Sequence, residues 1–256
     1  MSYTDRWQTT LKLAIKGERV IRWYSHSPFK LFRRYMMMKY TIEEARHIVI
    51  NCSKDYKRLL ADKEFIIVYR DRIDNEIKYI ELVFLAKNYQ HLTGMNLVDA
   101  KGNIIEHRSE DFYRKCVENK LSISEIKFRQ DGMSHLKLQA LPAITRFTSI
   151  TKITGDSNGN QPYLIVDKLV GGVNFCLGLR KDSNIDKYVP VSALQRNIKE
   201  LTSNPSQILF IMEKNIGAAD KFKKIKHVAK GLDLNTLKLS YDISEKITLK
   251  EYHYRN

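Results

Sequence analysis

The stretch that decides the fold is residues 84–94, which read Phe84-Leu85-Ala86-Lys87-Asn88-Tyr89-Gln90-His91-Leu92-Thr93-Gly94. It follows residues 77–84, where apolar and polar side chains alternate as they do in a half-buried strand. It ends at Gly94, and glycine readily adopts the positive φ that ends regular structure. The pattern therefore predicts a strand followed by a break, with Lys87, His91 and Thr93 close to the break.

His91 is the residue of this stretch with acid–base chemistry. Histidine has an unperturbed pKa near neutrality, so an imidazole at the end of a strand can accept or donate a proton. The same side chain can instead hydrogen-bond a nearby carbonyl group and stabilise the loop. Both roles are open at this point.

The charge of the chain points to a polyanionic partner. Its 256 residues include 44 lysines and arginines against 29 aspartates and glutamates, which gives a net charge of +15. Nucleic acid is the commonest partner of so basic a protein. A membrane surface, an acidic protein and a lysine excess that serves only solubility are the alternatives.

Other features favour a protein of the cytoplasm. No apolar run reaches the roughly 20 residues that span a bilayer, and no signal-peptide pattern is present. Cys52, Cys116 and Cys176 lie far apart and none belongs to a CxxC pair, which suits a reducing compartment and argues against a zinc site. We therefore predict no metal and no cofactor.

The chain divides into three predicted parts. Residues 1–40 form a basic arm in which arginines, including Arg33 and Arg34, alternate with tryptophan and tyrosine. Such an arm suits nucleic acid, an anionic membrane or a mere appendage. A working domain follows over 41–216, and a basic C-terminal extension over 217–256, with a helix expected at 222–231 and strands at 237–241 and 247–254.

The working domain is expected to begin with helices and to continue as a sheet. Thr41 is a good N-cap for a helix to about residue 61, and a hairpin of strands follows over 65–69 and 77–84. Helices segregated from an antiparallel sheet make the α+β class. The remaining predicted elements are helices over 110–119, 134–144 and 192–201 and strands over 148–154, 163–166, 173–180, 188–191 and 208–212.

These elements could house a metal-independent ribonuclease. RNA carries its own nucleophile in the 2′-hydroxyl, so the protein need supply only a base, an acid and cations for the phosphate. For the cations the alternatives are a solvated turn or a helix end, and for Tyr188 a place in the core. The candidate catalytic residues are His91, Arg180 and Tyr188, and the candidate nucleic-acid-binding residues are Lys87, Arg146, Lys152, Lys168, Lys181, Arg33 and Arg34.

Several of these segments together resemble a known family. They are residues 42–56, residues 65–69, the motif Phe84-x-x-x-Asn88-Tyr89-x-His91-Leu92-Thr93-Gly94, Phe112-Tyr113 with Leu121-Ser122, and Gly178-Leu179 with residues 188–194. Over residues 41–216 the chain resembles the phage and mobile-element branch of the barnase–EndoU–colicin–RelE-like nucleases. The resemblance implies a RelE/barnase-like α+β fold, a metal-independent ribonuclease activity, and site roles for His91 and Thr93.

Three hypotheses about function follow. The first is an endoribonuclease toxin or effector that cleaves RNA, such as tRNA or mRNA, by attack of the 2′-hydroxyl on the phosphodiester. The second is a nuclease-fold binder without turnover that inhibits a host nucleic-acid-dependent defence complex, as an anti-CRISPR protein does. The third is a plain nucleic-acid-binding module, whose affinity falls steeply with salt.

Overall fold

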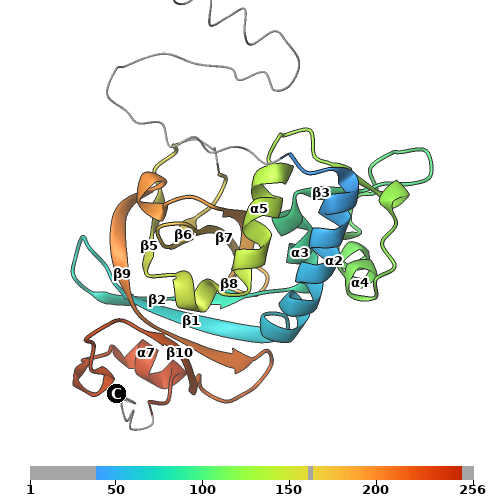
Figure 1. The fold of residues 1–256 in the computed structure, drawn as a ribbon. Coiled ribbons are helices and arrows are strands. Elements are labelled where there is room, and N and C mark those ends of the chain that lie inside the picture. The colour runs from blue at the N-terminus through green and yellow to red at the C-terminus, as the bar shows by residue number, and fades with distance from the viewer. Residues whose placement is uncertain (1–38, 161–163, 250–256) are drawn as a thin grey trace, which may run out of the picture. The chain divides into compact units, whose positions relative to one another are not determined.

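The computed structural model describes residues 39–160 and 164–249, which belong to one compact unit (Figure 1). Arg33 and Arg34 lie outside these residues, as does most of the predicted arm. No helix in the described residues combines the length and apolar character that crossing a membrane requires.

The first described helix, α2, spans Ile42–Leu59 as the sequence predicts. Its start is fixed by a reciprocal pair of hydrogen bonds: the amide of Glu44 donates to Oγ1 of Thr41 (3.1 Å), and the amide of Thr41 donates to Oε2 of Glu44 (2.7 Å). Its buried face, with Ala45, Val49 and Tyr56, packs into the main core.

The predicted hairpin is present and belongs to the large sheet. Strands β1 (Lys63–Arg70) and β2 (Ile77–Val83) pair antiparallel, with Ile67 opposite Ile80. Strand β9 (Thr202–Asn215) pairs antiparallel with the other edge of β1. Thus β1 lies between its sequence neighbour and a strand from far along the chain.

The sheet closes on itself. Its order is β1-β2-β8-β7-β6-β5-β9-β10, and the pairing of β9 with β1 joins the two sides into a ring of seven strands from which β10 extends. The structure is thus mixed α and β, as predicted, with one parallel pair, β2 with β8, among antiparallel ones. The other strands are β5 (Ile153–Ser157), β6 (Lys168–Gly171), β7 (Cys176–Asp182), β8 (Lys187–Leu194) and β10 (Lys224–Val228).

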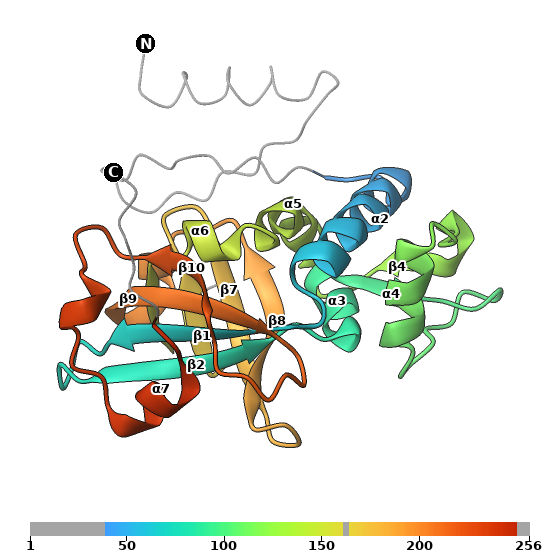
Figure 2. The ribbon, with the colours of Figure 1, turned by 90° about the horizontal axis from the view of Figure 1, so that it is seen from below.

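The helices between residues 86 and 150 lie with α2 on one side of the strands (Figure 2). Their main core joins Phe112 and Phe147 to Phe65, Ile67 and Phe84 of the hairpin region. A small antiparallel pair, β3 with β4, precedes α5, whose bounds agree with the prediction. These elements are α3 (Ala86–Thr93), β3 (Met95–Leu97), α4 (Ser109–Val117), β4 (Ile126–Phe128), α5 (Ser134–Ile144) and α6 (Phe147–Ile150).

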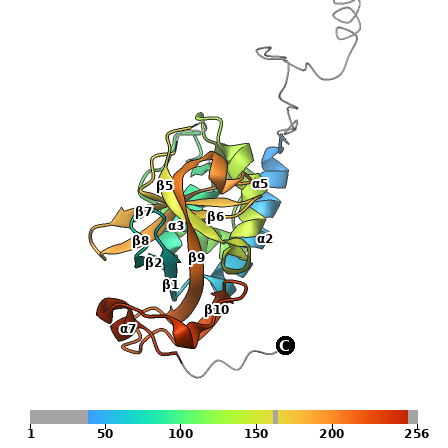
Figure 3. The same cartoon turned by 90° about the vertical axis from the view of Figure 1, so that its left-hand side faces the viewer.

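The C-terminal segment covers a second face of the sheet (Figure 3). Because side chains alternate along a strand, Phe65 and Ile67 enter the main core while Ile66 and Val68 face the opposite way. Ile66 and Val68 pack there with residues of β9 and with Phe222, Leu234, Ile243 and Ile247. Strand β10, a 3-10 turn (Leu234–Thr236) and helix α7 (Tyr241–Lys246) carry that cover.

Two predictions for the second half of the chain are wrong, the first residues of the strand over 148–154 and the helix over 192–201. The strand over 148–154 begins as helix α6, because Phe147 is fully buried against Phe65 with ring centroids 4.9 Å apart, which holds this segment in one helical turn. The helix over 192–201 is instead the end of β8, where Ser192 pairs with Gly178, followed by a 3-10 turn over Ile198–Glu200.

The predicted tail elements also differ. The helix over 222–231 is strand β10, since its backbone pairs with β9 from Lys224 opposite Glu213 to Val228 opposite Phe210. The segment 237–241 forms no strand and leads into α7. Residues 164–166 of the strand predicted over 163–166 are irregular, and residue 163 and residues 250–254 of the predicted strands lie outside the described residues.

Candidate active site

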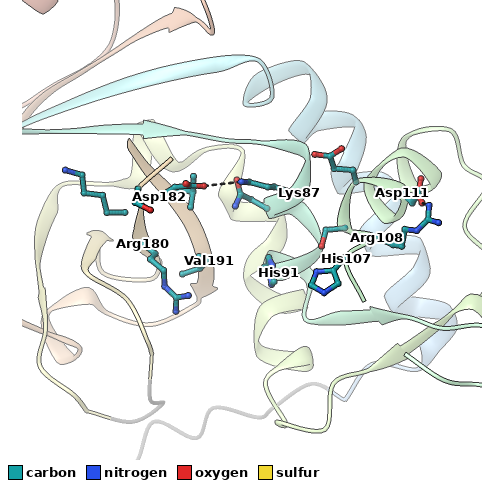
Figure 4. Close-up of a pocket in the computed structure, with 14 residues that line it drawn as sticks. Lys87, His91, His107, Arg108, Asp111, Arg180, Asp182 and Val191 are labelled. Atoms are coloured by element: carbon teal, nitrogen blue, oxygen red, sulfur yellow. Dashed lines mark hydrogen bonds and ion pairs between the residues drawn. The ribbon is translucent and has the colours of Figure 1, made fainter. Parts of the chain in front are cut away.

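A cleft of about 740 Å³ opens between the helical side and the ends of β7 and β8. Figure 4 shows His91 and His107 on the helical side and Arg180 with Val191 on the sheet side. Its volume is within the range of small-ligand sites. The remaining charged groups lining the cleft are Lys87, Arg108, Glu110, Asp111, Lys181 and Asp182.

His91 lies in the last turn of α3, and the prediction of a strand-to-loop junction is wrong at this point. The helix begins because Oδ1 of Asn88 accepts a hydrogen bond from the amide of Leu85 (3.1 Å). It ends at Gly94, whose φ of 69° is left-handed. A Cβ at Gly94 would lie 2.8 Å from Cα of Ser134, so α3 and α5 approach each other as closely as only glycine allows.

Positive charge surrounds the His91 imidazole. Nη2 of Arg129 lies 3.3 Å from its Nδ1, and Nζ of Lys137 donates to the His91 carbonyl (2.8 Å). The ring is exposed to the cleft, but neighbouring protein removes part of its hydration. Desolvation lowers the pKa of His91, and the charges of Arg129, Lys137 and Arg180 lower it further. The neutral imidazole is therefore favoured at neutral pH.

Arg180 is the guanidinium on the sheet side of the cleft. Its Nη2 donates to the carbonyl of Ile165 (2.8 Å). Within residues 39–160 and 164–249, no carboxylate lies within ion-pair distance of Arg180 or Arg129. Other cations lining the cleft are paired: Lys87 with Asp182 (3.1 Å) and Arg108 with Asp111 (2.7 Å). Arg180 thus keeps N–H donors for an anionic ligand.

Thr93 lies outside the cleft although it is only two residues from His91. Its side chain is fully buried, and Oγ1 donates to the carbonyl of Gln90 (2.8 Å) while it accepts from the amide of Met95 (3.1 Å). Both hydrogen-bonding roles of the hydroxyl are used within the protein. The structure therefore gives Thr93 a part in ending α3 and keeps its hydroxyl away from the cleft.

Tyr188 and Lys181 share a register position on β8 and β7. Val189 and Val191 of β8 line the cleft, so the alternation of side chains directs Tyr188 to the other face, where it packs half-buried against the main core. Lys181 borders the cleft, but because it lies directly opposite Tyr188 its side chain shares the face of Tyr188, and its Nζ pairs with Asp186 (2.7 Å). Of the predicted residues, the structure thus brings the side chains of Lys87, His91 and Arg180 together at the cleft.

The other predicted binding residues lie away from the cleft. Lys168 pairs with Asp156 (2.6 Å). Nζ of Lys152 lies 3.1 Å from Nδ1 of His227, and desolvation followed by the Lys152 charge lowers the pKa of His227 to about 4. Arg146 is exposed where the chain enters α6.

Sequence reasoning missed the cations closest to His91. Arg129 follows the three-residue strand β4, so its position depends on a pairing with β3 that the sequence did not indicate. Lys137 had a signal: it lies one helical turn from Leu141 and is itself only 7% exposed, so a lysine stood within the buried stripe of α5. Desolvation and the Arg129 charge lower the pKa of Lys137 to about 8.

No group of three or more histidine, cysteine, aspartate or glutamate side chains in the described residues could hold a metal ion.

A family model described as phage-Barnase-EndoU-ColicinE5/D-RelE like nuclease4 matches residues 48–230, more than half of the chain. The chain belongs to this family. This nuclease-like phage family agrees with the resemblance found in the sequence, and its description as a nuclease family suggests a nucleic-acid substrate.

The matched region contains the whole cleft. Lys87, His91, His107 and Arg180 all fall between residues 48 and 230 of this nuclease-family chain. The comparisons with curated proteins and with solved structures found no match to this chain.

Proposed function

We propose that this protein is a metal-independent endoribonuclease whose reaction takes place in the cleft around His91. One observation carries the proposal: an imidazole whose neutral form is favoured lies in a cleft with Arg180, a guanidinium free of any carboxylate partner among the described residues. Membership of a nuclease-like phage family supports a nucleic-acid substrate.

The reaction needs two proton transfers and a cation. The 2′-oxygen forms a bond to phosphorus while the bond from phosphorus to the 5′-oxygen breaks. The proton of the 2′-hydroxyl goes to a base, and the leaving 5′-oxygen takes up a proton, so the products are a 2′,3′-cyclic phosphate and a free 5′-hydroxyl. Groups with a pKa near the working pH serve both transfers best.

The cleft contains groups of the required kinds. His91 and His107 both line it, and together they can provide the proton acceptor and the proton donor. Arg180 can hold the non-bridging oxygens through two N–H groups and stabilise the charge that develops on the phosphorane. Lys87 adds positive charge at the rim for a flanking phosphate of tRNA or mRNA, and its partner Asp182 reduces that charge.

Cleavage of labelled RNA in the presence of a metal chelator tests the proposal. We expect cleavage that leaves a 2′,3′-cyclic phosphate and that falls at least about 100-fold in His91→Ala, since either a proton-transfer group or a pre-organised donor to the phosphate contributes about 10² or more in rate. His47→Ala is the matched control, because His47 is exposed on α2 and does not line the cleft. We expect that variant to cleave at the native rate.

The outcomes separate the hypotheses. Cleavage by His91→Ala at an unchanged rate would remove His91 from the reaction. Binding of RNA without products, weakened steeply by salt, would contradict the enzyme and leave a nucleic-acid-binding module. Toxicity on expression that disappears with His91→Ala is the result expected for an active ribonuclease in the cytoplasm.

A further inference from the structure

We infer that Arg129 is a positioning residue that fixes the tautomer of His91, so that Nδ1 accepts and Nε2 carries the proton offered to a ligand in the cleft. This inference rests on the proposed function, in which His91 contacts the reacting phosphodiester. Arg129 itself does not line the cleft and would act through the imidazole.

The contact between the two side chains determines the direction of the hydrogen bond. Nη2 of Arg129 lies 3.3 Å from Nδ1 of His91. A guanidinium is always protonated and has only donors, so the ring nitrogen beside it must be the acceptor. In the neutral imidazole one ring nitrogen accepts and the other carries the hydrogen. Nε2 is therefore the protonated nitrogen while this contact is made.

Arg129 is held in place by its own backbone. Its amide donates to Oγ of Ser134 (2.9 Å), and that hydroxyl donates to the carbonyl of Gly94 (2.6 Å) at the end of α3. Nε of Arg129 is buried and makes no hydrogen bond, and no carboxylate of the described residues lies within ion-pair distance of the guanidinium. The end of α3 and the start of α5 thus keep Arg129 beside His91.

The main chain of His91 is fixed by a second cation. Nζ of Lys137, on α5, donates to the His91 carbonyl (2.8 Å) and lies 3.5 Å from the carbonyl of Val191 on β8. The charged groups that face the imidazole are Arg129 after β4, Lys137 on α5 and Arg180 on β7. All three are cations and each of them disfavours the imidazolium, while the carboxylates that line the same cleft on α4 are those of Glu110 and Asp111.

The tautomer assigns a role to each histidine of the cleft. With its proton on Nε2, His91 donates a hydrogen bond to a non-bridging phosphate oxygen as an uncharged donor. Removal of the 2′-hydroxyl proton and its delivery to the leaving 5′-oxygen then require another group, and His107 is the second imidazole that lines the cleft.

The test is nitrogen NMR of the full-length protein with labelled histidine, which distinguishes protonated from unprotonated ring nitrogens. In the native protein we expect His91 to be neutral at neutral pH with the proton on Nε2. In Arg129→Met we expect both tautomers and a rise of about one unit in the pKa of His91, because one neighbouring charge is lost. Arg58→Met, which removes an exposed arginine paired with Asp55, should change neither property.

Two results would overturn the inference: a proton on Nδ1 of His91 in the native protein, or an unchanged tautomer and pKa in a folded Arg129→Met protein. The native measurement needs no variant, so a variant that fails to fold does not block the test. Where the native protein cleaves RNA, the pH–rate profile of Arg129→Met should shift to higher pH, and a lower rate with an unshifted profile would contradict the positioning role. A native protein that never cleaves RNA refutes the proposed function, while the tautomer still decides the role of Arg129.

Discussion

Two regions of this molecule concentrate positive charge, and they do so in opposite ways. At one end of the hairpin, cations surround two buried carboxylates. Glu64 lies 2.6 Å from Lys187 and 3.5 Å from Lys214. Around His91, by contrast, Arg129, Lys137 and Arg180 gather about an imidazole, and no carboxylate is paired with either arginine among the described residues.

Glu213 shows how the first region neutralises its charge. It lies on β9, and its carboxylate is close to Lys224 (2.7 Å), Lys226 (3.2 Å) and Lys63 (3.8 Å). Burial alone would raise the pKa of Glu213, but the hydrogen bonds from Lys224 and Lys226 outweigh burial and lower it.

The difference shows that net charge alone does not locate a binding surface. The +15 of the chain includes many cations whose nearest partner is an internal carboxylate. Such a cation gains little from a phosphate, because binding would require it to leave an existing partner. An arginine without a carboxylate partner has no such cost, and the arginines of this kind beside His91 therefore identify the cleft better than charge counts do.

The largest expected effect is on the carboxylate region. Glu64→Gln should destabilise the protein by about 3 kcal/mol, because Lys187 and Lys214 are left partly buried without a counter-charge. Arg180→Gln, which breaks no ion pair among the described residues, should change stability by less than about 0.5 kcal/mol. Urea unfolding measures both. Equal losses in the two variants would remove the distinction between the regions.

A smaller effect is expected from the buried lysine beneath the cleft. Lys137 has its pKa lowered from 10.5 to about 8, so between these pH values the unfolded chain binds more protons and stability rises with pH. Lys137→Met removes this contribution. The difference in the free energy of unfolding, native protein minus variant, should therefore increase by about 2 kcal/mol between pH 8 and pH 10. Parallel urea-unfolding curves at all pH values would show that Lys137 titrates normally.

The smallest effect concerns affinity for RNA. Arg180→Gln should weaken RNA binding about tenfold and reduce the slope of log affinity against log salt by about one, since one phosphate contact is lost. Arg58→Gln, in which the lost arginine is already paired with Asp55 at 2.7 Å, should leave both quantities unchanged. Fluorescence titrations of RNA over a range of salt concentrations measure the affinity and its salt dependence for both variants. The same loss in both variants would mean that paired and unpaired arginines are equivalent.

The features that sequence predicted well depend on neighbouring residues. The start of α2 is set by Thr41 and Glu44, three residues apart, and the bounds of α5 follow from apolar spacing. The closure of the sheet depends on the pairings of β2 with β8 and of β1 with β9, which join residues more than a hundred positions apart and which no local pattern reveals.

In the candidate site, too, the residues close together in the sequence were predictable and those brought together only by folding were not. His91 and Lys87 stand four residues apart on α3 and share a helix face, which places both at the cleft. Arg180 could be suggested because it follows an apolar run. Arg129 could not, since its approach to His91 depends on the contact between Gly94 and Ser134, two residues that meet only in the folded chain.

The cover provided by the C-terminal segment bears on how this enzyme candidate should be handled. The region matched to the nuclease family ends at residue 230, yet Leu234, Ile243 and Ile247 shield Ile66 and Val68. A recombinant fragment that ends at residue 230 would expose the apolar face around Ile66 and Val68 to water and would self-associate. Precipitation and inactivity of such a fragment would then result from the missing C-terminal segment and not from the chemistry of the cleft. Assays should therefore use protein that extends through residue 249 or beyond.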